Sequence, residues 1–86
     1  MIKIEIYSGN FCPYCLRAKS LLKQRGLTFV EYNVQGEPDK RSEMLERARG
    51  ARTIPQIFIN DRHVGGYDEL HALDRKGELD AWLSGQ

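Results

Sequence analysis

The sequence predicts an α/β fold with a four-stranded mixed sheet in the order βαβαββα and with helices on both faces of the sheet. Three observations support this prediction. Apolar and polar residues alternate over 2–7, which is typical of a strand. Segments rich in β-branched and aromatic residues at 28–34 and 55–59 alternate with helix-like segments. The pair Asn60-Asp61 then predicts a tight turn into a short strand at 62–64.

The first strand carries charges that a covered central strand would not be expected to hold. Ile2, Ile4 and Ile6 alternate there with Lys3 and Glu5. Since we expect helices on both faces of the sheet, we expect these charged side chains where the cover is incomplete.

The first helix is predicted to begin at Cys12-Pro13, because proline suits the first helical position, where its missing N–H would be unpaired anyway. Gly26 is a good stop signal. The expected apolar stripe of this first helix is Cys15, Ala18 and Leu22, with Tyr14 and Leu21 beside it. The strand at 28–34 follows, and the connection between two parallel strands should be right-handed.

The second half continues the alternation. A helix over about 38–49 begins with proline and ends at a glycine. The strands at 55–59 and 62–64 should form an antiparallel hairpin. A helix then runs from the residues after Gly65-Gly66 to about Lys76, and a last helical turn carries Leu79, Trp82 and Leu83.

The 86 residues predict one domain, residues 1–86. Apolar residues at 41% and charged residues at 29% fit an ordinary globular domain rather than a disordered chain. A net charge of +1 gives no reason to expect nucleic acid or a membrane as partner. No segment reads as a membrane span or an export signal, so we expect a reducing cytoplasmic setting, where two cysteines are more often catalytic or metal-binding than structural.

Cys12-Pro13-Tyr14-Cys15 places two thiols three residues apart at a helix start. Such neighbours lie within the distance that a disulfide needs. Cys12 lies where unpaired backbone N–H groups and the helix dipole favour negative charge, a setting that lowers a cysteine pKa to about 3.5–7.5. Cys15 faces the core. We therefore expect Cys12 to be the nucleophile and Cys15 the resolving thiol.

The alternative for this pair is half of a zinc site. Zinc takes about four ligands, and His63 and His71 are the remaining candidates. Their spacing from each other and from Cys15 fits no common zinc pattern, so a redox pair is favoured.

Two further segments have both a structural and a functional interpretation. Thr53-Ile54-Pro55 either simply opens a strand, where proline is tolerated, or forms a cis-proline loop beside Cys12 whose Ile54 backbone binds an extended thiol ligand. Gly65-Gly66-Tyr67-Asp68 is either a flexible helix entry or a place where a carboxylate approaches a helix N-terminus. Together with the cysteine pair they favour a functional site.

Cys12-Pro13-Tyr14-Cys15, the segment 53–59 and Gly65-Gly66-Tyr67-Asp68 together resemble the dithiol glutaredoxins, most closely the bacterial class of about this length. The resemblance covers almost the whole chain. It implies a thioredoxin-like fold, a Cys12–Cys15 disulfide in the oxidised form, and a glutathione-disulfide oxidoreductase. It implies glutathione as reductant, with no permanently bound cofactor. Expected partners are glutathionylated or disulfide-containing proteins, with ribonucleotide reductase one possibility, and the chain should be a monomer.

The resemblance also implies a glutathione groove in which Pro55 is cis and the backbone of Ile54 pairs with the cysteinyl part of the ligand. Its expected residues are Tyr14 and Thr53 at the sides, Gly66, Tyr67 and Asp68 at the γ-glutamyl end, and Arg52 at the glycine carboxylate.

Two positions depart from the family pattern. Gly9 stands where many members carry a lysine that helps to bind glutathione, so Arg52, Arg49 or Lys40 would have to supply the cation. Tyr67 stands where many members carry cysteine.

Two rival functions remain open on the sequence. One is a redoxin reduced by thioredoxin reductase, which the Gly65–Asp68 segment disfavours. The other is a module that bridges an iron–sulfur cluster through Cys12 and glutathione, which Pro13 disfavours. Beside these two functions, a purely structural domain is the remaining alternative, and an acidic, alkylation-sensitive Cys12 would exclude it.

Overall fold

The computed structural model describes residues 2–84. It confirms the predicted order of elements, with ends that differ by a few residues. No helix within this range is long and apolar enough to cross a membrane. The elements are β1 (Ile4–Ser8), α1 (Pro13–Gln24), β2 (Val30–Asn33), α2 (Pro38–Arg47), β3 (Gln56–Ile59), β4 (Arg62–Gly65), α3 (Tyr67–Lys76) and α4 (Leu79–Leu83).

The sheet is mixed and has the strand order β2-β1-β3-β4. β1 and β2 run parallel, as the α1 crossover requires. β1 pairs antiparallel with β3, so that Tyr7 lies opposite Gln56. β3 and β4 form the predicted antiparallel hairpin, with His63 opposite Phe58 and an irregularity in register between Ile57 and Phe58.

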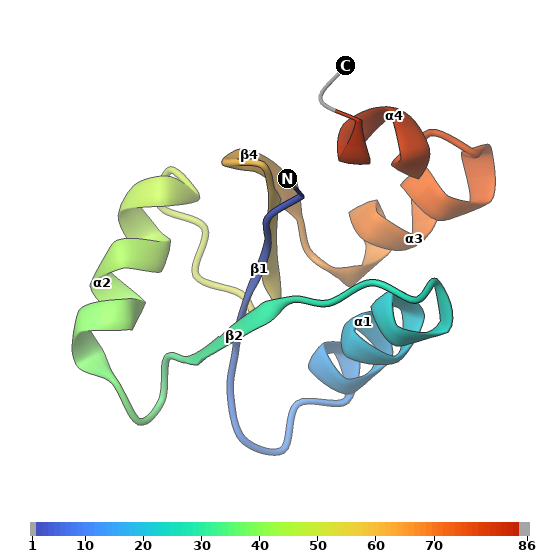
Figure 1. Ribbon diagram of the computed structural model, residues 1–86. Helices are drawn as coiled ribbons and strands as arrows, with labels where there is room; N and C mark the ends of the chain where they lie inside the picture. The colour runs from blue at the N-terminus through green and yellow to red at the C-terminus, as the bar shows by residue number, and fades with distance from the viewer. Residues whose placement is uncertain (1, 85–86) are drawn as a thin grey trace.

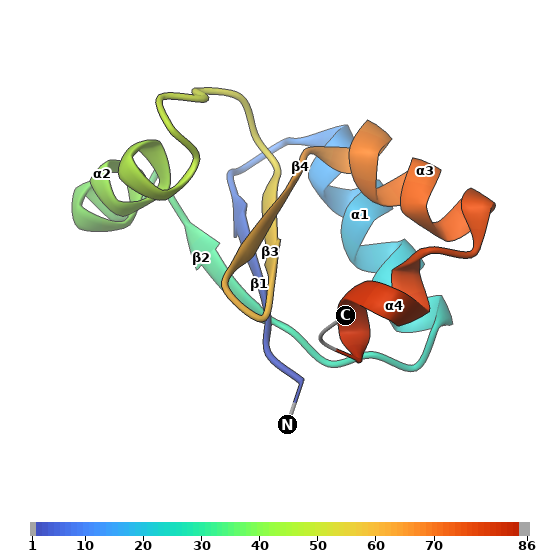
Figure 2. The same ribbon diagram turned by 90° about the horizontal axis from the view of Figure 1, so that it is seen from above.

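Helices cover both faces of the sheet, as predicted. Figures 1 and 2 show α2 on one face and α1, α3 and α4 on the other. Alternate residues of β1 supply the two cores, because successive side chains of a strand point to opposite faces. Ile4 and Ile6 pack with Leu22 and Leu70 on the side of α1 and α3. Tyr7 packs with Met44, Ala48 and Phe58 on the side of α2.

Glu5 corrects the expectation of incomplete cover on β1. It is only 6% exposed, although Lys3 beside it is exposed. Its carboxylate accepts a hydrogen bond at 3.0 Å from Arg47 Nη2 of α2 and another at 3.1 Å from the Tyr32 hydroxyl. The charge is therefore buried under α2 because that helix supplies its partner, which a pattern of strand residues alone does not reveal.

Tyr7, two residues along the same strand, joins this buried polar cluster. Its hydroxyl donates to Glu43 and accepts a hydrogen bond at 2.7 Å from Arg47 Nη1. Burial, together with the nearby Glu43 carboxylate, raises the pKa of Tyr7 to about 12. Polar contacts thus tie α2 to the central strand beside its small apolar face.

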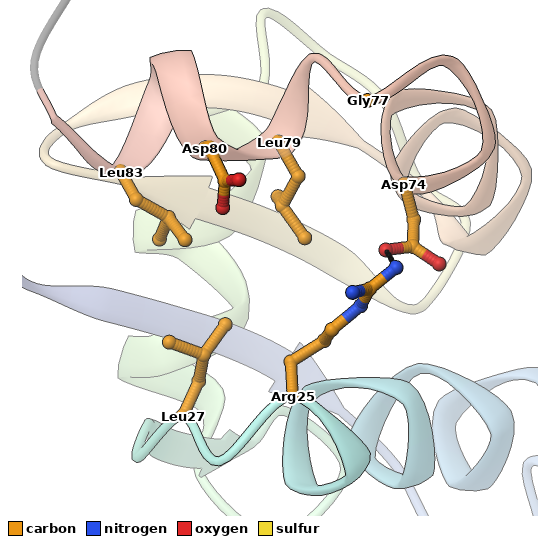
Figure 3. Close-up of a pocket in the computed structure, with 7 residues that line it drawn as sticks. All are labelled: Arg25, Leu27, Asp74, Gly77, Leu79, Asp80 and Leu83. Carbon is orange, nitrogen blue, oxygen red and sulfur yellow. Dashed lines mark ion pairs between the residues drawn. The ribbon is translucent and has the colours of Figure 1, made fainter.

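The end of α1 that lies away from the cysteines is closed by α3 and α4. Figure 3 shows the Leu27, Leu79 and Leu83 side chains around a pocket of about 230 Å³, with an ion pair from Arg25 to Asp74 at its edge. Leu79 is 4% exposed and belongs to the core. None of the predicted site residues lines this pocket.

Candidate active site

Cys12 and Cys15 are joined by a disulfide, with 5.2 Å between their Cα atoms. Cys12 is the N-cap residue of α1, and Cys15 lies in the first turn. The backbone N–H of Cys15 donates to Cys12 Sγ at 3.1 Å. Cys15 is 1% exposed, whereas Cys12 is partly exposed. In the reduced form, the same N–H and the helix N-terminus would stabilise negative charge on Cys12.

The residues around the pair explain how it is presented. Phe11 adopts φ 52°, which turns the chain sharply into α1, and Pro13 occupies the first turn. The expected place of Tyr14 beside the buried stripe was wrong, since its side chain is 53% exposed. Tyr14 lies one position before the inward-facing Cys15, which places it about 100° around the helix from that residue. The Arg17 guanidinium carbon lies 5.2 Å from the Tyr14 ring centroid.

Gly9 is required by a close approach in the loop before Cys12. A Cβ atom at this position would lie 2.7 Å from Ile54 Cδ1 and 2.8 Å from Gln35 Cδ. Gln35 is held there because its side-chain oxygen accepts a hydrogen bond at 2.6 Å from the Asn10 N–H. The space beside Gly9 is thus filled by the side chains of Ile54 and Gln35.

The segment 53–55 lies directly against the cysteine pair. The Ile54–Pro55 peptide bond is cis, as the resemblance implied. The carbonyl oxygen of Ile54 is 3.9 Å from Cys12 Sγ. Pro55 is buried, and β3 begins one residue later, so the sheet holds this loop in place.

A pocket of about 260 Å³ opens beside this loop. It brings together seven of the eight residues that sequence reasoning placed in a glutathione groove; the eighth, Arg52, is exposed next to Thr53 and does not line the pocket. The lining residues are Tyr14, Thr53, Ile54, Pro55, Gly66, Tyr67, Asp68 and Glu69.

Glu69 is the lining residue that sequence reasoning missed. Its Oε1 accepts a hydrogen bond at 2.6 Å from the backbone N–H of Gly66, the N-cap of α3. A glutamate three residues after an N-cap is a known sign of a helix start, so the Gly66-Tyr67-Asp68-Glu69 spacing could have identified it.

Aromatic rings connect the pocket with the surface of α1 and α3. The ring centroids of Tyr67 and Tyr14 lie 6.2 Å apart. The Tyr67 ring also stacks on His71, with 5.5 Å between the ring centroids. His63 instead stacks on Phe58 at 4.9 Å, on the other side of the sheet. Within residues 2–84 there is no group of three metal-ligating side chains.

The chain is similar to known proteins in both sequence and fold. The glutaredoxin family model matches residues 4–64. Glutaredoxin 3 of Escherichia coli K12 is 49% identical over 83 residues, which are 96% of this chain and 99% of that protein. The solution structure of glutaredoxin from Brucella melitensis superposes with a TM-score of 0.85 at 47% identity, covering 100% of this chain and 94% of the other.

A second solved structure, the buckwheat glutaredoxin–glutathione complex, gives a TM-score of 0.85 at 30% identity and covers 98% of this chain and 78% of that one. The fold is therefore the thioredoxin-like fold of these structures, and by sequence and structure this chain belongs to the glutaredoxin family.

Proposed function

We propose that this protein is a glutathione-dependent thiol–disulfide oxidoreductase that works through Cys12 and Cys15. The observation that carries the proposal is the cysteine pair at the N-terminus of α1. Its partly exposed member, Cys12, accepts a hydrogen bond from a backbone N–H and lies 3.9 Å from the carbonyl oxygen of Ile54, a residue that lines the adjacent pocket. The partly exposed Cys12 and the buried Cys15 match the different tasks of an attacking and a resolving thiol.

The proposed first step is attack by the Cys12 thiolate on the glutathione sulfur of a mixed disulfide. The Cys12–glutathione bond forms, the substrate sulfur–sulfur bond breaks, and the substrate leaves as a thiolate that takes a proton from water. A second glutathione then attacks the glutathione sulfur of this adduct. This attack forms the disulfide of oxidised glutathione, breaks the Cys12–glutathione bond and restores the Cys12 thiolate.

Protein disulfides would use both cysteines. Cys12 attacks one sulfur of the substrate, and the Cys15 thiolate then attacks Cys12 Sγ and releases the reduced protein. The product is the Cys12–Cys15 disulfide, which two glutathione molecules reduce. The 5.2 Å between the Cα atoms supports this step, because it lies within the range that a disulfide requires.

The pocket beside Cys12 is the proposed glutathione groove. Its cis-proline loop brings the Ile54 backbone within reach of a thiol bound at Cys12, and Thr53 and Tyr14 border the same space. At the far end, the start of α3 offers backbone N–H groups to a carboxylate, and Asp68 offers a negative charge to an ammonium group. Arg52, exposed beside Thr53, is the proposed partner of the glycine carboxylate.

The test is reduction of a small glutathione mixed disulfide, coupled to glutathione reductase. Cys12→Ser should abolish activity, because serine is not a nucleophile in thiol–disulfide exchange, while Cys15→Ser should retain much of it. Loss of this reaction in Cys15→Ser together with survival in Cys12→Ser would overturn the assignment. Equal turnover with thioredoxin reductase as the sole electron source would favour the rival redoxin.

The chain is further proposed to act as a monomeric single domain, residues 1–86, in the reducing cytoplasm, where its cysteines would be kept as thiols between turnovers. Glutathionylated and disulfide-containing proteins are the proposed partners.

A further inference from the structure

Three polar side chains form a hydrogen-bonded chain that ends at the pocket. His63 Nε2 lies 2.6 Å from the side-chain oxygen of Gln56. Gln56 Nε2 in turn donates to the Thr53 carbonyl oxygen at 2.9 Å and to the Thr53 hydroxyl at 3.1 Å. Thr53 lines the pocket, whereas Gln56 and His63 lie behind it on β3 and β4.

The chain lies on the face of the sheet that α2 covers only in part. α2 packs over β1 and β2, and Figure 2 shows it beside β2, away from β4. Gln56 is 3% exposed, and its strand partner is the buried Tyr7. His63 lies on the edge strand, is an exposed residue, and stacks on Phe58 with ring centroids 4.9 Å apart. A buried amide is thus fixed between an edge histidine and the pocket.

The direction of every hydrogen bond in the chain is determined. The carbonyl oxygen of Thr53 can only accept, so the atom of Gln56 that faces it must be the amide nitrogen. That nitrogen donates to both Thr53 oxygens, so the hydroxyl oxygen is an acceptor in this contact. The amide oxygen therefore faces His63, whose Nε2 must carry the hydrogen.

This direction determines where the Thr53 hydroxyl hydrogen points. Because the hydroxyl oxygen accepts from Gln56, its own hydrogen is directed away from Gln56, and Thr53 is exposed on the pocket side. Hydrogen bonds that are linked in series polarise one another, which strengthens the Thr53 hydroxyl as a donor.

We propose that His63 and Gln56 are positioning residues that orient the Thr53 hydroxyl as a hydrogen-bond donor to an acceptor oxygen of the bound glutathione peptide. The inference rests on the proposed function. His63 and Gln56 touch neither the ligand nor the reacting sulfurs; they act through Thr53. The effect should therefore appear in the capture of substrate and not in the rate of the bound complex.

The test begins at His63, because substitution of the buried Gln56 would also change the packing. His63→Phe keeps an aromatic ring against Phe58 and removes the ring N–H. It should lower kcat/KM for the glutathione mixed disulfide about three- to tenfold, the effect of one lost hydrogen bond, and leave kcat unchanged. His63→Gln is the matched control, since its amide nitrogen can take the place of Nε2, and it should restore most of kcat/KM.

A double-mutant cycle with Thr53→Val isolates the coupling. Thr53→Val removes the hydroxyl that the chain orients, so adding His63→Phe should cause no further loss of kcat/KM. Losses that multiply in the double variant would overturn the inference, as would an unchanged kcat/KM in His63→Phe or equal losses in His63→Phe and His63→Gln. Failure of the proposed function is distinguished because the unsubstituted protein would then show no glutathione-dependent turnover.

Discussion

At the scale of single residues, the two cysteines differ because one helical turn separates a cap from a core position. Cys12 receives the Cys15 N–H and stays partly exposed, while Cys15 packs at 1% exposure. This difference follows from the helix start that Pro13 specifies, and needs no further group. The same local geometry leaves Tyr14 exposed beside the pocket.

Gly9 offers a sharp test of how closely the cysteine loop approaches Ile54. Gly9→Ala places a Cβ where Ile54 Cδ1 would be 2.7 Å away and Gln35 Cδ 2.8 Å away, so both side chains must move. We expect a loss of about 1–3 kcal/mol in the free energy of unfolding. Because Ile54 lines the pocket, kcat/KM for the glutathione mixed disulfide should fall as well.

Gly36→Ala is the matched control for this substitution. A Cβ on Gly36 meets nothing within 4 Å, and its φ lies outside the left-handed region. Denaturant unfolding of both variants should therefore show Gly36→Ala close to the unsubstituted protein. Equal stability and activity of the two variants would mean that the side chains of Ile54 and Gln35 move aside without loss of stability or activity.

At the scale of elements, the strands and helices were predictable because their periodicities and end signals agree along the chain. The order of elements, the hairpin and the helices on both faces were predicted, and the structure confirms them. The exposure of Tyr14 and the burial of Glu5 were not predicted. The exposure of Tyr14 follows from its place about 100° around the helix from the buried Cys15. The burial of Glu5 depends on Arg47 from another element, and periodicity within one strand does not contain that information.

The candidate site divides in the same way. The cysteine motif and the two loop segments are local motifs, and the structure gathers both loop segments and Tyr14 of the cysteine motif around one pocket. Cys12 lies next to it, with Sγ 3.9 Å from the Ile54 carbonyl oxygen. The Thr53–Gln56–His63 chain depends on the register of β3 with β4 and on the turn before β3, so no short motif reveals it.

The attachment of α4 can be tested through Leu79. This side chain is 4% exposed and packs in the core with Leu22 and Leu70, although α4 has only five residues. Leu79→Ala should lower the free energy of unfolding by about 2–5 kcal/mol, the usual cost of a cavity in a core. Equilibrium unfolding in denaturant measures it.

Asp80→Ala, on the same helix but exposed, is the control and should change stability by less than about 0.5 kcal/mol. A Leu79→Ala loss as small as that of Asp80→Ala would show that α4 is held by other contacts. The cysteine pair lies at the opposite end of α1. The folded fraction of Leu79→Ala should therefore reduce the glutathione mixed disulfide as fast as the unsubstituted protein does.

At the scale of the whole molecule, two layers of side chains hold the sheet in different ways. The side of α1, α3 and α4 is an apolar core. The side of α2 combines an apolar cluster with the buried Glu5–Arg47 ion pair and the Tyr7–Glu43 hydrogen bond. Contacts on the α2 side should therefore contribute more to the pH dependence of the free energy of unfolding than contacts on the other side.

Tyr7 makes this dependence measurable at alkaline pH. The folded protein holds the pKa of Tyr7 at about 12, against about 10 for an unfolded chain. Between these values the unfolded chain releases a proton that the folded protein keeps, so the free energy of unfolding is full below pH 10 and falls as pH rises toward 12. The contribution of Tyr7 corresponds to about 2–3 kcal/mol. Tyr7→Phe is less stable at pH 8 but lacks this ionisation, so the free energies of unfolding of the two proteins should converge between pH 10 and pH 12 when measured by denaturant unfolding. A constant difference across that range would show that Tyr7 ionises equally in both states.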